Sequence, residues 1–194
     1  MNVQTANTPA TPVIDTPRLR LRPFREDDLD RLFECARDPV IGDRAGWKPH
    51  ETREESETVL HEVFIDKETT WAIELRESGM FIGTVGLIPD PKRENTGLRM
   101  IGYWLDRPYW GCGFMCEAAT AALDHVFRTL RMTAVTATCY PDNDRSRNLL
   151  LRLGFVEEGM LHMADKDRHG NLRDLLSFIL AYEDYANHNK CLEI

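Results

Sequence analysis

The stretch Ile101-Gly-Tyr-Trp-Leu-Asp-Arg-Pro-Tyr-Trp-Gly-Cys-Gly-Phe-Met-Cys-Glu117 decides how the rest of the chain is interpreted. It begins as a β-strand, and the apolar residues that follow it recur at helical spacing. The loop between them contains Gly111 and Gly113, whose missing Cβ atoms let the backbone turn sharply and approach a ligand. The first N–H groups of a helix have no intrahelical partner and lie at the positive end of its dipole. This segment can therefore bind a phosphate through backbone groups alone.

A Gly-x-Gly pair alone does not identify a phosphate site. A tight strand-to-helix turn without any ligand needs the same two glycines. A dinucleotide-binding loop has the longer pattern Gly-x-Gly-x-x-Gly, whereas Cys116 occupies the third glycine position here. The nucleoside triphosphate P-loop requires Gly-Lys-Ser/Thr, which does not occur. The phosphate-binding interpretation needs a second signal.

That signal lies downstream, where Asn143-Asp-Arg-Ser146 opens a predicted helix that ends at Arg152-Leu-Gly154-Phe155. The two motifs together resemble the GCN5-related N-acetyltransferase (GNAT) family. The family's pyrophosphate loop reads Arg/Gln-x-x-Gly-x-Gly/Ala, and its later helix carries Asn-x-x-Ser and then Lys-x-Gly-Phe. Here Trp110 and Met115 depart from the loop pattern and Arg152 replaces the lysine. The resemblance covers nearly the whole chain, and the closest branch is the RimJ/RimL-like ribosomal-protein N-terminal acetyltransferases.

The resemblance implies acetyl-coenzyme A as co-substrate and Ser146 as the catalytic residue that gives a proton to the leaving thiolate. A backbone N–H near Leu105 would stabilise the oxyanion. Simpler interpretations remain open: Asn143 as a helix N-cap, Ser146 as an ordinary first-turn serine, and the strand side chains as core. The residues that the resemblance assigns to the cofactor are Tyr103, Trp104, Leu105, Gly111, Cys112, Gly113, Phe114, Met115, Cys116 and Asn143.

One departure concerns the general base. Many family members carry Glu two residues before the Gly-Tyr pair, where it acts through water, and Met100 occupies that position here. Either another group serves as base, or the acceptor amine needs little help.

Cysteines and acids near these motifs have both ordinary and functional interpretations. Cys112 and Cys116 could form a metal pair or an activated thiolate, but no nearby His completes a metal set, so we expect no metal. Glu117 complements a helix N-terminus. The predicted turn near Asp165, Asp167 and Asp174 is either simply solvated or attracts an amine.

The order of elements predicts an α+β fold, the GNAT acyl-CoA N-acyltransferase fold, with a mixed seven-stranded sheet and about four helices on both faces. We expect residues 42–49 to form a loop and the helix at residues 52–66 to turn Val59, Val63 and Phe64 inward. Residues 1–12 are expected to be a disordered lead-in, 13–185 a single N-acetyltransferase domain and 186–194 a surface tail. The predicted strands are residues 18–24, 70–76, 80–88, 98–105, 133–140, 155–163 and 172–182, and the other helices 29–36, 115–130 and 144–153.

Composition bounds the function. A net charge of -8 disfavours nucleic acid, and the five cysteines fit a reducing cytoplasm better than a disulfide framework. No apolar run approaches the ~20 residues of a membrane helix. We therefore expect a cytoplasmic N-acetyltransferase that acts by direct transfer in a ternary complex on a primary amine, such as a protein or peptide N-terminus. The alternatives are a small-molecule acetyltransferase (aminoglycoside, polyamine or amino acid) and a non-catalytic acyl-CoA-binding sensor. The resemblance also allows a homodimer.

Overall fold

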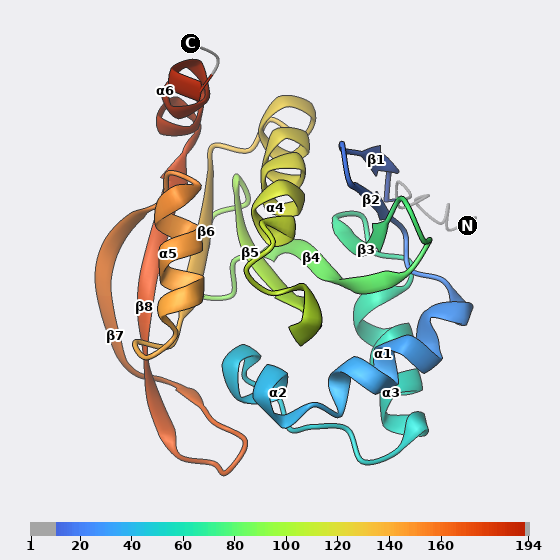
Figure 1. Cartoon of the computed structure of the whole chain (residues 1–194). Helices are drawn as coiled ribbons and strands as arrows, with labels where there is room; N and C mark the ends of the chain where they lie inside the picture. The colour runs from blue at the N-terminus through green and yellow to red at the C-terminus, as the bar shows by residue number, and fades with distance from the viewer. Residues whose placement is uncertain (1–10, 193–194) are drawn as a thin grey trace, which may run out of the picture.

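The computed structural model describes residues 11–192, and it contains one mixed sheet in the order β1-β2-β3-β4-β5-β6-β8-β7 (Figure 1). All neighbouring strands are antiparallel except β5 and β6, which are parallel. The expected α+β class is confirmed. The strands are β1 Ile14–Asp15, β2 Leu19–Arg22, β3 Thr70–Leu75, β4 Phe81–Pro89, β5 Leu98–Leu105, β6 Ala134–Cys139, β7 Val156–Lys166 and β8 Leu172–Ala181.

Helices cover both faces of the sheet (Figure 1). The first three pack on one face, while α4 and α5 pack on the other. Two of the helices, α3 and α4, widen into a π-helical turn at their C-terminal ends. The helices are α1 Leu29–Ala36, α2 Pro39–Ala45, α3 Arg53–Val59 with the π-turn Leu60–Phe64, α4 Phe114–Asp124 with the π-turn His125–Thr129, α5 Asp144–Arg152 and α6 Tyr182–Leu192.

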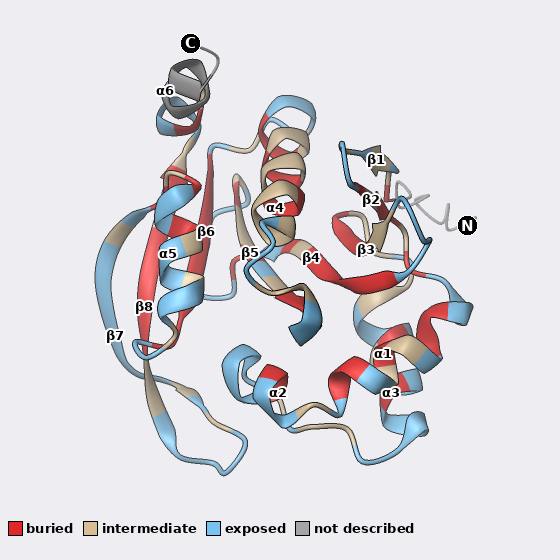
Figure 2. Cartoon of the chain, in the orientation of Figure 1, coloured by how far each residue is buried: buried red, intermediate tan, exposed pale blue. Residues whose placement is uncertain are grey.

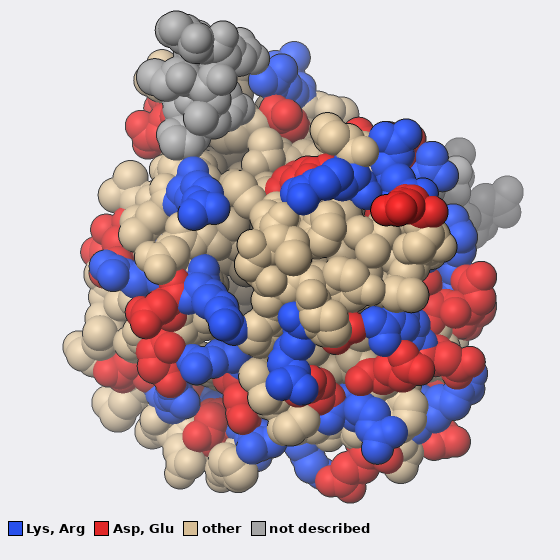
Figure 3. Space-filling view, in the orientation of Figure 1, with Lys and Arg blue, Asp and Glu red and all other residues tan. Residues whose placement is uncertain are grey.

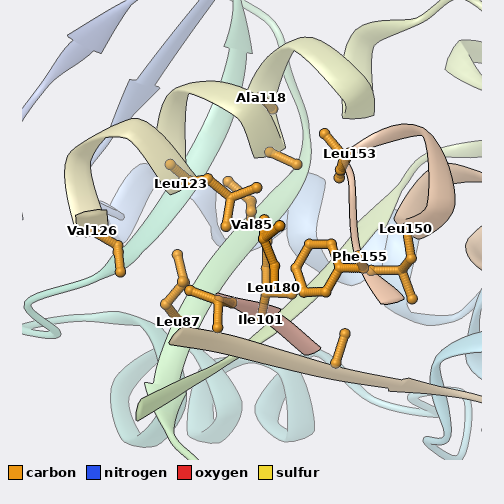
Figure 4. Close-up of a cluster of buried hydrophobic side chains, with 14 of the residues drawn as sticks. Val85, Leu87, Ile101, Ala118, Leu123, Val126, Leu150, Leu153, Phe155 and Leu180 are labelled. Atoms are coloured by element: carbon orange, nitrogen blue, oxygen red, sulfur yellow. The ribbon is translucent and has the colours of Figure 1, made fainter. Parts of the chain in front are cut away.

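The hydrophobic core has two parts, because side chains alternate between the two faces of a strand. On β3, Trp71 and Ile73 belong to the cluster under α4 and α5, while Ala72 belongs to the cluster under α1. Figure 4 shows the larger cluster, in which Val85 and Ile101 of the sheet meet α4 and α5. Figure 2 shows where this core lies along the sheet: the central strands are largely buried, whereas β7 is mostly exposed.

The parallel pair β5–β6 is much shorter than its neighbours. Only Leu98, Arg99 and Met100 pair with β6, opposite Ala134 to Thr136. Beyond Met100, β5 stays paired with β4 as far as Leu105, and β6 stays paired with β8 as far as Cys139. The two halves of the sheet therefore separate at their carboxyl ends.

Two expectations from the sequence are wrong in the first third of the chain. Residues 42–49 were expected to form a loop, but α2 covers Pro39–Ala45. The helix has ordinary signals: the Asp38 side chain accepts from Val40 N, Pro39 lies at the first helical position, and Gly46 ends it with φ 86°. Val63, expected to point inward, is 50% exposed, and Leu60 takes the buried position instead.

The ends of the fold also differ from expectation. The sheet has eight strands, because β1 adds a short edge strand beside β2. α6 (Tyr182–Leu192) extends into residues 186–194, the segment that is expected to be a surface tail. Residues 1–10 of the expected lead-in lie outside the described part of the chain. Thr11 and Pro12 bond to the domain, through the carbonyl of Lys67 and the indole of Trp71 respectively.

A buried ion cluster joins the end of β2 to β3. The Arg22 guanidinium donates to both carboxylate oxygens of Asp28, at 2.8 and 2.6 Å, and to Glu74 at 2.5 Å. The side chains of Arg22 and Asp28 are each 4% exposed. Breaking a buried ion pair leaves an uncompensated charge in the protein interior.

We expect Arg22→Leu to lower the free energy of unfolding by about 3–5 kcal/mol, because two carboxylates lose their cation. Arg20→Leu on the same strand is the control, since Arg20 and its partner Asp15 are nearly half exposed. Urea unfolding of both variants measures the difference. Equal, small losses in the two variants would contradict a structural role for the buried cluster.

Candidate active site

A cavity of about 1070 Å³ occupies the gap between the two halves of the sheet. It is lined by β4 and β5 on one side, by β6 and the start of α5 on the other, and by residues of α2 and of the α3 π-turn. The loop before α4 forms one end of it. We call this cavity the cleft.

Backbone groups of β5 face the cleft in alternation. Asp106 N donates to Ile82 O at 2.9 Å, so the facing pair Leu105 and Gly83 is a non-hydrogen-bonded pair of the antiparallel ladder. It follows that Trp104 directs its N–H and C=O toward β4, while Tyr103 and Leu105 direct theirs into the gap. The Leu105 carbonyl accepts from the Trp110 indole at 2.7 Å. Of the three strand residues that the resemblance assigns to the cofactor, Trp104 is the one whose backbone groups face away from the gap, although the residue lines the cleft.

The loop at residues 110–116 has the geometry that the two glycines predicted. Gly111 and Gly113 have φ 77° and 79°, in the left-handed region that glycine adopts without strain. The first bond of α4 runs from Glu117 N to Gly113 O, so the N–H groups of Phe114, Met115 and Cys116 precede the hydrogen-bonded part of the helix. A Cβ on Gly111 would meet nothing within 4 Å, so the backbone there is open to a ligand.

Glu117 and Arg18 fix this loop to the turn between β1 and β2. Glu117 accepts from Thr16 Oγ1 at 2.6 Å, from Arg18 N at 2.9 Å and from Arg18 Nε at 2.7 Å. Arg18 also donates to the Cys112 carbonyl at 2.9 Å and lies over the Phe114 ring. Burial alone would raise the pKa of Glu117, but the hydrogen bonds from Thr16 and Arg18 outweigh it and lower the pKa. Glu117 is therefore charged at neutral pH, and its carboxylate holds the loop in place.

The start of α5 faces this loop across the cleft. Asn143 caps the helix, accepting from Ser146 N at 3.3 Å, as the simpler interpretation predicted. The Ser146 Oγ lies 2.9 Å from the Tyr103 phenol oxygen, and either group can donate. Arg145 stacks on the Trp110 ring at 4.7 Å. The two motifs that are far apart in sequence therefore meet at one cavity.

Burial sets the protonation of the cleft's hydroxyls and thiol. It raises the pKa of Tyr103 more than the hydrogen bond to Ser146 lowers it, so the phenol keeps its proton at neutral pH. Burial also raises the pKa of the Cys139 thiol to about 11. Burial, with the hydrogen bond to Asp165 adding to it, raises the pKa of Tyr140 to about 12. These groups are donors at pH 7 and not bases.

α2 bridges the two halves of the sheet over the cleft. Arg44 donates to the Asp142 carbonyl at 2.8 Å, and the Arg44 carbonyl accepts from Asn143 Nδ2 at 3.3 Å. Asp43 pairs with Arg168 at 2.8 Å, near the β7–β8 turn. Figure 3 shows charged side chains of both signs gathered over this lower part of the molecule.

The structure brings most of the predicted residues to the cleft and leaves a few aside. Cys112 is the one predicted cofactor residue that does not line the cavity, and neither Asp167 nor Asp174 does. Asp165 lines it, bonded to Tyr140. The Tyr103 hydroxyl, Arg145 and Cys139 were missed as site side chains, since no sequence pattern signals which side chains a splayed strand pair brings together.

The part of the chain that the structure describes holds neither a metal cluster nor a membrane span. No group of three or more His, Cys, Asp and Glu side chains among these residues could hold a metal ion. Within residues 11–192, no helix has both the length and the apolar content needed to cross a membrane.

Comparison with known proteins agrees with the cleft and its two motifs. The profile of the Acetyltransferase (GNAT) domain matches residues 18–156. The chain belongs to this family. It is accordingly an N-acetyltransferase, and the family uses acetyl-CoA.

Similar proteins fall into characterised and uncharacterised groups. The GNAT chain is 29% identical over 175 residues to the uncharacterized N-acetyltransferase p20 of Bacillus licheniformis, covering 88% of this chain and 97% of p20. It is 42% identical over 59 residues to the [ribosomal protein uS5]-alanine N-acetyltransferase of Escherichia coli, covering 30% of each chain.

Solved structures share the fold. A putative acetyltransferase from T. thermophilus has a TM-score of 0.76 and 28% identity, over 95% of this chain and 97% of that one. The spermidine N-acetyltransferase of Vibrio cholerae, solved with CoA and spermine, has a TM-score of 0.75 and 22% identity, over 89% of this chain and all of that one. The latter likeness concerns the fold alone.

The loop's role can be tested at Gly113. We expect Gly113→Val to weaken coenzyme A binding by about ten- to a hundredfold, equivalent to losing one charge-assisted hydrogen bond. The control is Gly79→Val in the β3–β4 turn, where φ is 70° and a Cβ would meet nothing within 4 Å. Both variants carry the same backbone strain, so melting temperatures should fall alike. Calorimetry that shows wild-type affinity in Gly113→Val would contradict the loop assignment.

The hydroxyl pair makes a second prediction. Ser146→Ala should lower the turnover number by about ten- to a thousandfold, the range of acid–base assistance, and leave coenzyme A affinity nearly unchanged. Tyr103→Phe should lower turnover less, because the phenol acts by orienting Ser146. The double variant should then be no slower than Ser146→Ala, as for two groups in one network. Additive losses would show that the two hydroxyls act independently. An unchanged turnover number in Ser146→Ala would show that Ser146 takes no part in the chemical step.

Proposed function

We propose that this acetyltransferase moves an acetyl group from acetyl-CoA to the α-amine of a protein or peptide N-terminus. The cofactor would be held by the backbone of residues 110–116 at its phosphates, and along its arm by the gap-facing backbone groups of Tyr103 and the N–H of Leu105. When bound, it supplies the activated acetyl thioester. Asn143 and Ser146 lie opposite this strand, beside the place where the thioester would end.

The choice of acceptor rests on the lack of acidic residues in β4 and β5, the two strands that line one side of the cleft. Neither β4 nor β5 contains an acidic residue, and Met100 occupies the position where many relatives carry Glu. Asp165 lines the cleft but accepts a hydrogen bond from Tyr140, and Asp142 is paired with Arg173. An amine that approaches over β4 and β5 therefore meets no free carboxylate on those strands.

Such a site suits an amine that is already neutral. An α-amine has a pKa of about 8 and a lysine side chain about 10.4, so at pH 7 the neutral fraction of the α-amine is roughly 250-fold larger. The hydroxyl of Ser146, oriented by Tyr103, can then return a proton to the departing sulfur. The similarity to the uS5-alanine N-acetyltransferase supports the same class of acceptor.

The test uses matched peptides with only a free N-terminus or only a free lysine. We expect the rate constant kcat/KM for the first to be larger, and to level off at about pH 9, one unit above the α-amine pKa of about 8, where most of the α-amine is neutral. For the lysine peptide it should keep rising to about pH 10. Thiol release followed across pH 6–10 gives both profiles, and mass spectrometry gives the acetylated atom.

Three results would overturn the proposal. A preference for the lysine peptide would show that another group in the cleft acts as a general base and deprotonates the amine. Acetylation of spermidine or an aminoglycoside but of neither peptide would favour a small-molecule acceptor. Coenzyme A binding without thiol release on any amine would indicate a sensor.

A further inference from the structure

The floor of the cleft carries a hollow on the face that α2 and the α3 π-turn cover. Gly86 of β4 stands directly opposite Gly102 of β5 in the sheet register, so two adjacent positions on one face have no side chain. Thr70 of β3 borders Gly86, with its Oγ1 3.1 Å from where a Cβ would lie. A Cβ on Gly102 would meet nothing within 4 Å, and the residue is exposed to the cleft. The space above Gly102 is therefore open.

Uncharged and mostly apolar side chains surround this hollow. On the sheet, Ile88 and Met100 stand opposite each other on one side of the glycines, and Thr84 and Trp104 on the other. Above the sheet, Val63 and Phe64 of the π-turn line the same cavity. We call these six residues, with Gly86 and Gly102, the glycine hollow.

Two members of the hollow are unusually exposed for their type. Val63 is 50% and Ile88 48% exposed, although both lie in the wall of a cavity. When an apolar group covers apolar surface inside a concave site, the binding free energy becomes more favourable by about 25 cal/mol per Å² of surface removed from water. A cation placed there would lose hydration without gaining a partner.

We propose that the glycine hollow holds the first side chain of the acceptor, and that this side chain is apolar. The proposal rests on the proposed function and names its substrate class: peptides whose N-terminal residue carries a medium-sized aliphatic group, such as Leu or Met. The hollow lies on the opposite face of the sheet from α4, and the gap between β5 and β6 connects the two faces. The α-amine next to the held side chain thus lies at the gap.

The sharpest test fills the hollow. Gly102→Val adds a side chain into open space, and the Gly102 backbone bonds to β4, so neither the fold nor the strand's cofactor-facing groups should change. In this variant, the ratio of kcat/KM for a Leu-first peptide to that for a Gly-first peptide should fall at least about tenfold relative to wild type. Melting temperature and calorimetric coenzyme A affinity are measured on the same preparation.

A matched pair of charges tests the wall. Val63→Asp places a carboxylate in the hollow and should cut kcat/KM for the Leu-first peptide by at least about tenfold. Val156→Asp is the control, because Val156 is 55% exposed on β7 and lies outside the cleft. It should change the same constant by no more than about twofold, as surface substitutions do.

The outcomes separate this proposal from the one on which it rests. Equal rates for Gly-first, Leu-first and Lys-first peptides in the wild type, all acetylated at the α-amine, would overturn the apolar hollow and keep the α-amine acceptor. An unchanged Leu/Gly ratio in Gly102→Val with intact coenzyme A binding would also overturn it. Failure to acetylate any peptide, with turnover on spermidine, would overturn the proposed function itself.

Discussion

The cleft exists because the sheet is held together at its middle by only three residue pairs. β5 pairs with β4 from Arg99 to Leu105 and β6 pairs with β8, so each half of the sheet is bonded internally, while strand pairing between the halves is limited to Leu98, Arg99 and Met100. Strands twist, and two strands that are released from each other diverge. The functional groups of the site lie along this divergence. The backbone groups of Tyr103 and Leu105 lack strand partners there because β6 has turned away, and buried backbone groups require partners.

Because backbone and side-chain directions alternate along β5, neighbouring residues of this strand face different parts of the site. Trp104 and Gly102 direct their backbone to β4 and their side-chain positions to the face under α2. Tyr103 directs its backbone into the gap and its ring to the face under α4, where its hydroxyl reaches Ser146. A shift of one residue in the β4–β5 register would exchange these assignments and send the Tyr103 ring to the wrong face. Register is therefore as important to this site as residue identity.

The sequence predicted those parts of the site that depend on local chemistry. The bounds of β5, the left-handed glycines of the loop and the Asn143 cap follow from patterns within a few residues. α2 was missed because Gly42 looks like a loop residue, although a Cβ there would meet Trp47 O at 2.7 Å, so the chain needs glycine in the helix where it folds back. The pairing of Gly86 with Gly102 and of Tyr103 with Ser146 could not be predicted, because each joins segments whose relative register no local pattern encodes.

The contacts that close the cleft are weaker in kind than those that hold the domain. Arg44 and Asp142, which bridge α2 to the α5 side, have side chains 47% and 64% exposed, and Arg168 and Asp43 are 27% and 48% exposed. Exposed ion pairs contribute about 0–1 kcal/mol each. The Arg22 cluster that anchors β2 to β3 is buried, so its loss would expose the interior to unpaired charge. α2 can thus part from the far half of the sheet at small cost while the strands keep their register. For the acceptor proposed above, a protein N-terminus, this asymmetry would let the peptide enter over α2 while the Tyr103–Ser146 pair stays in place.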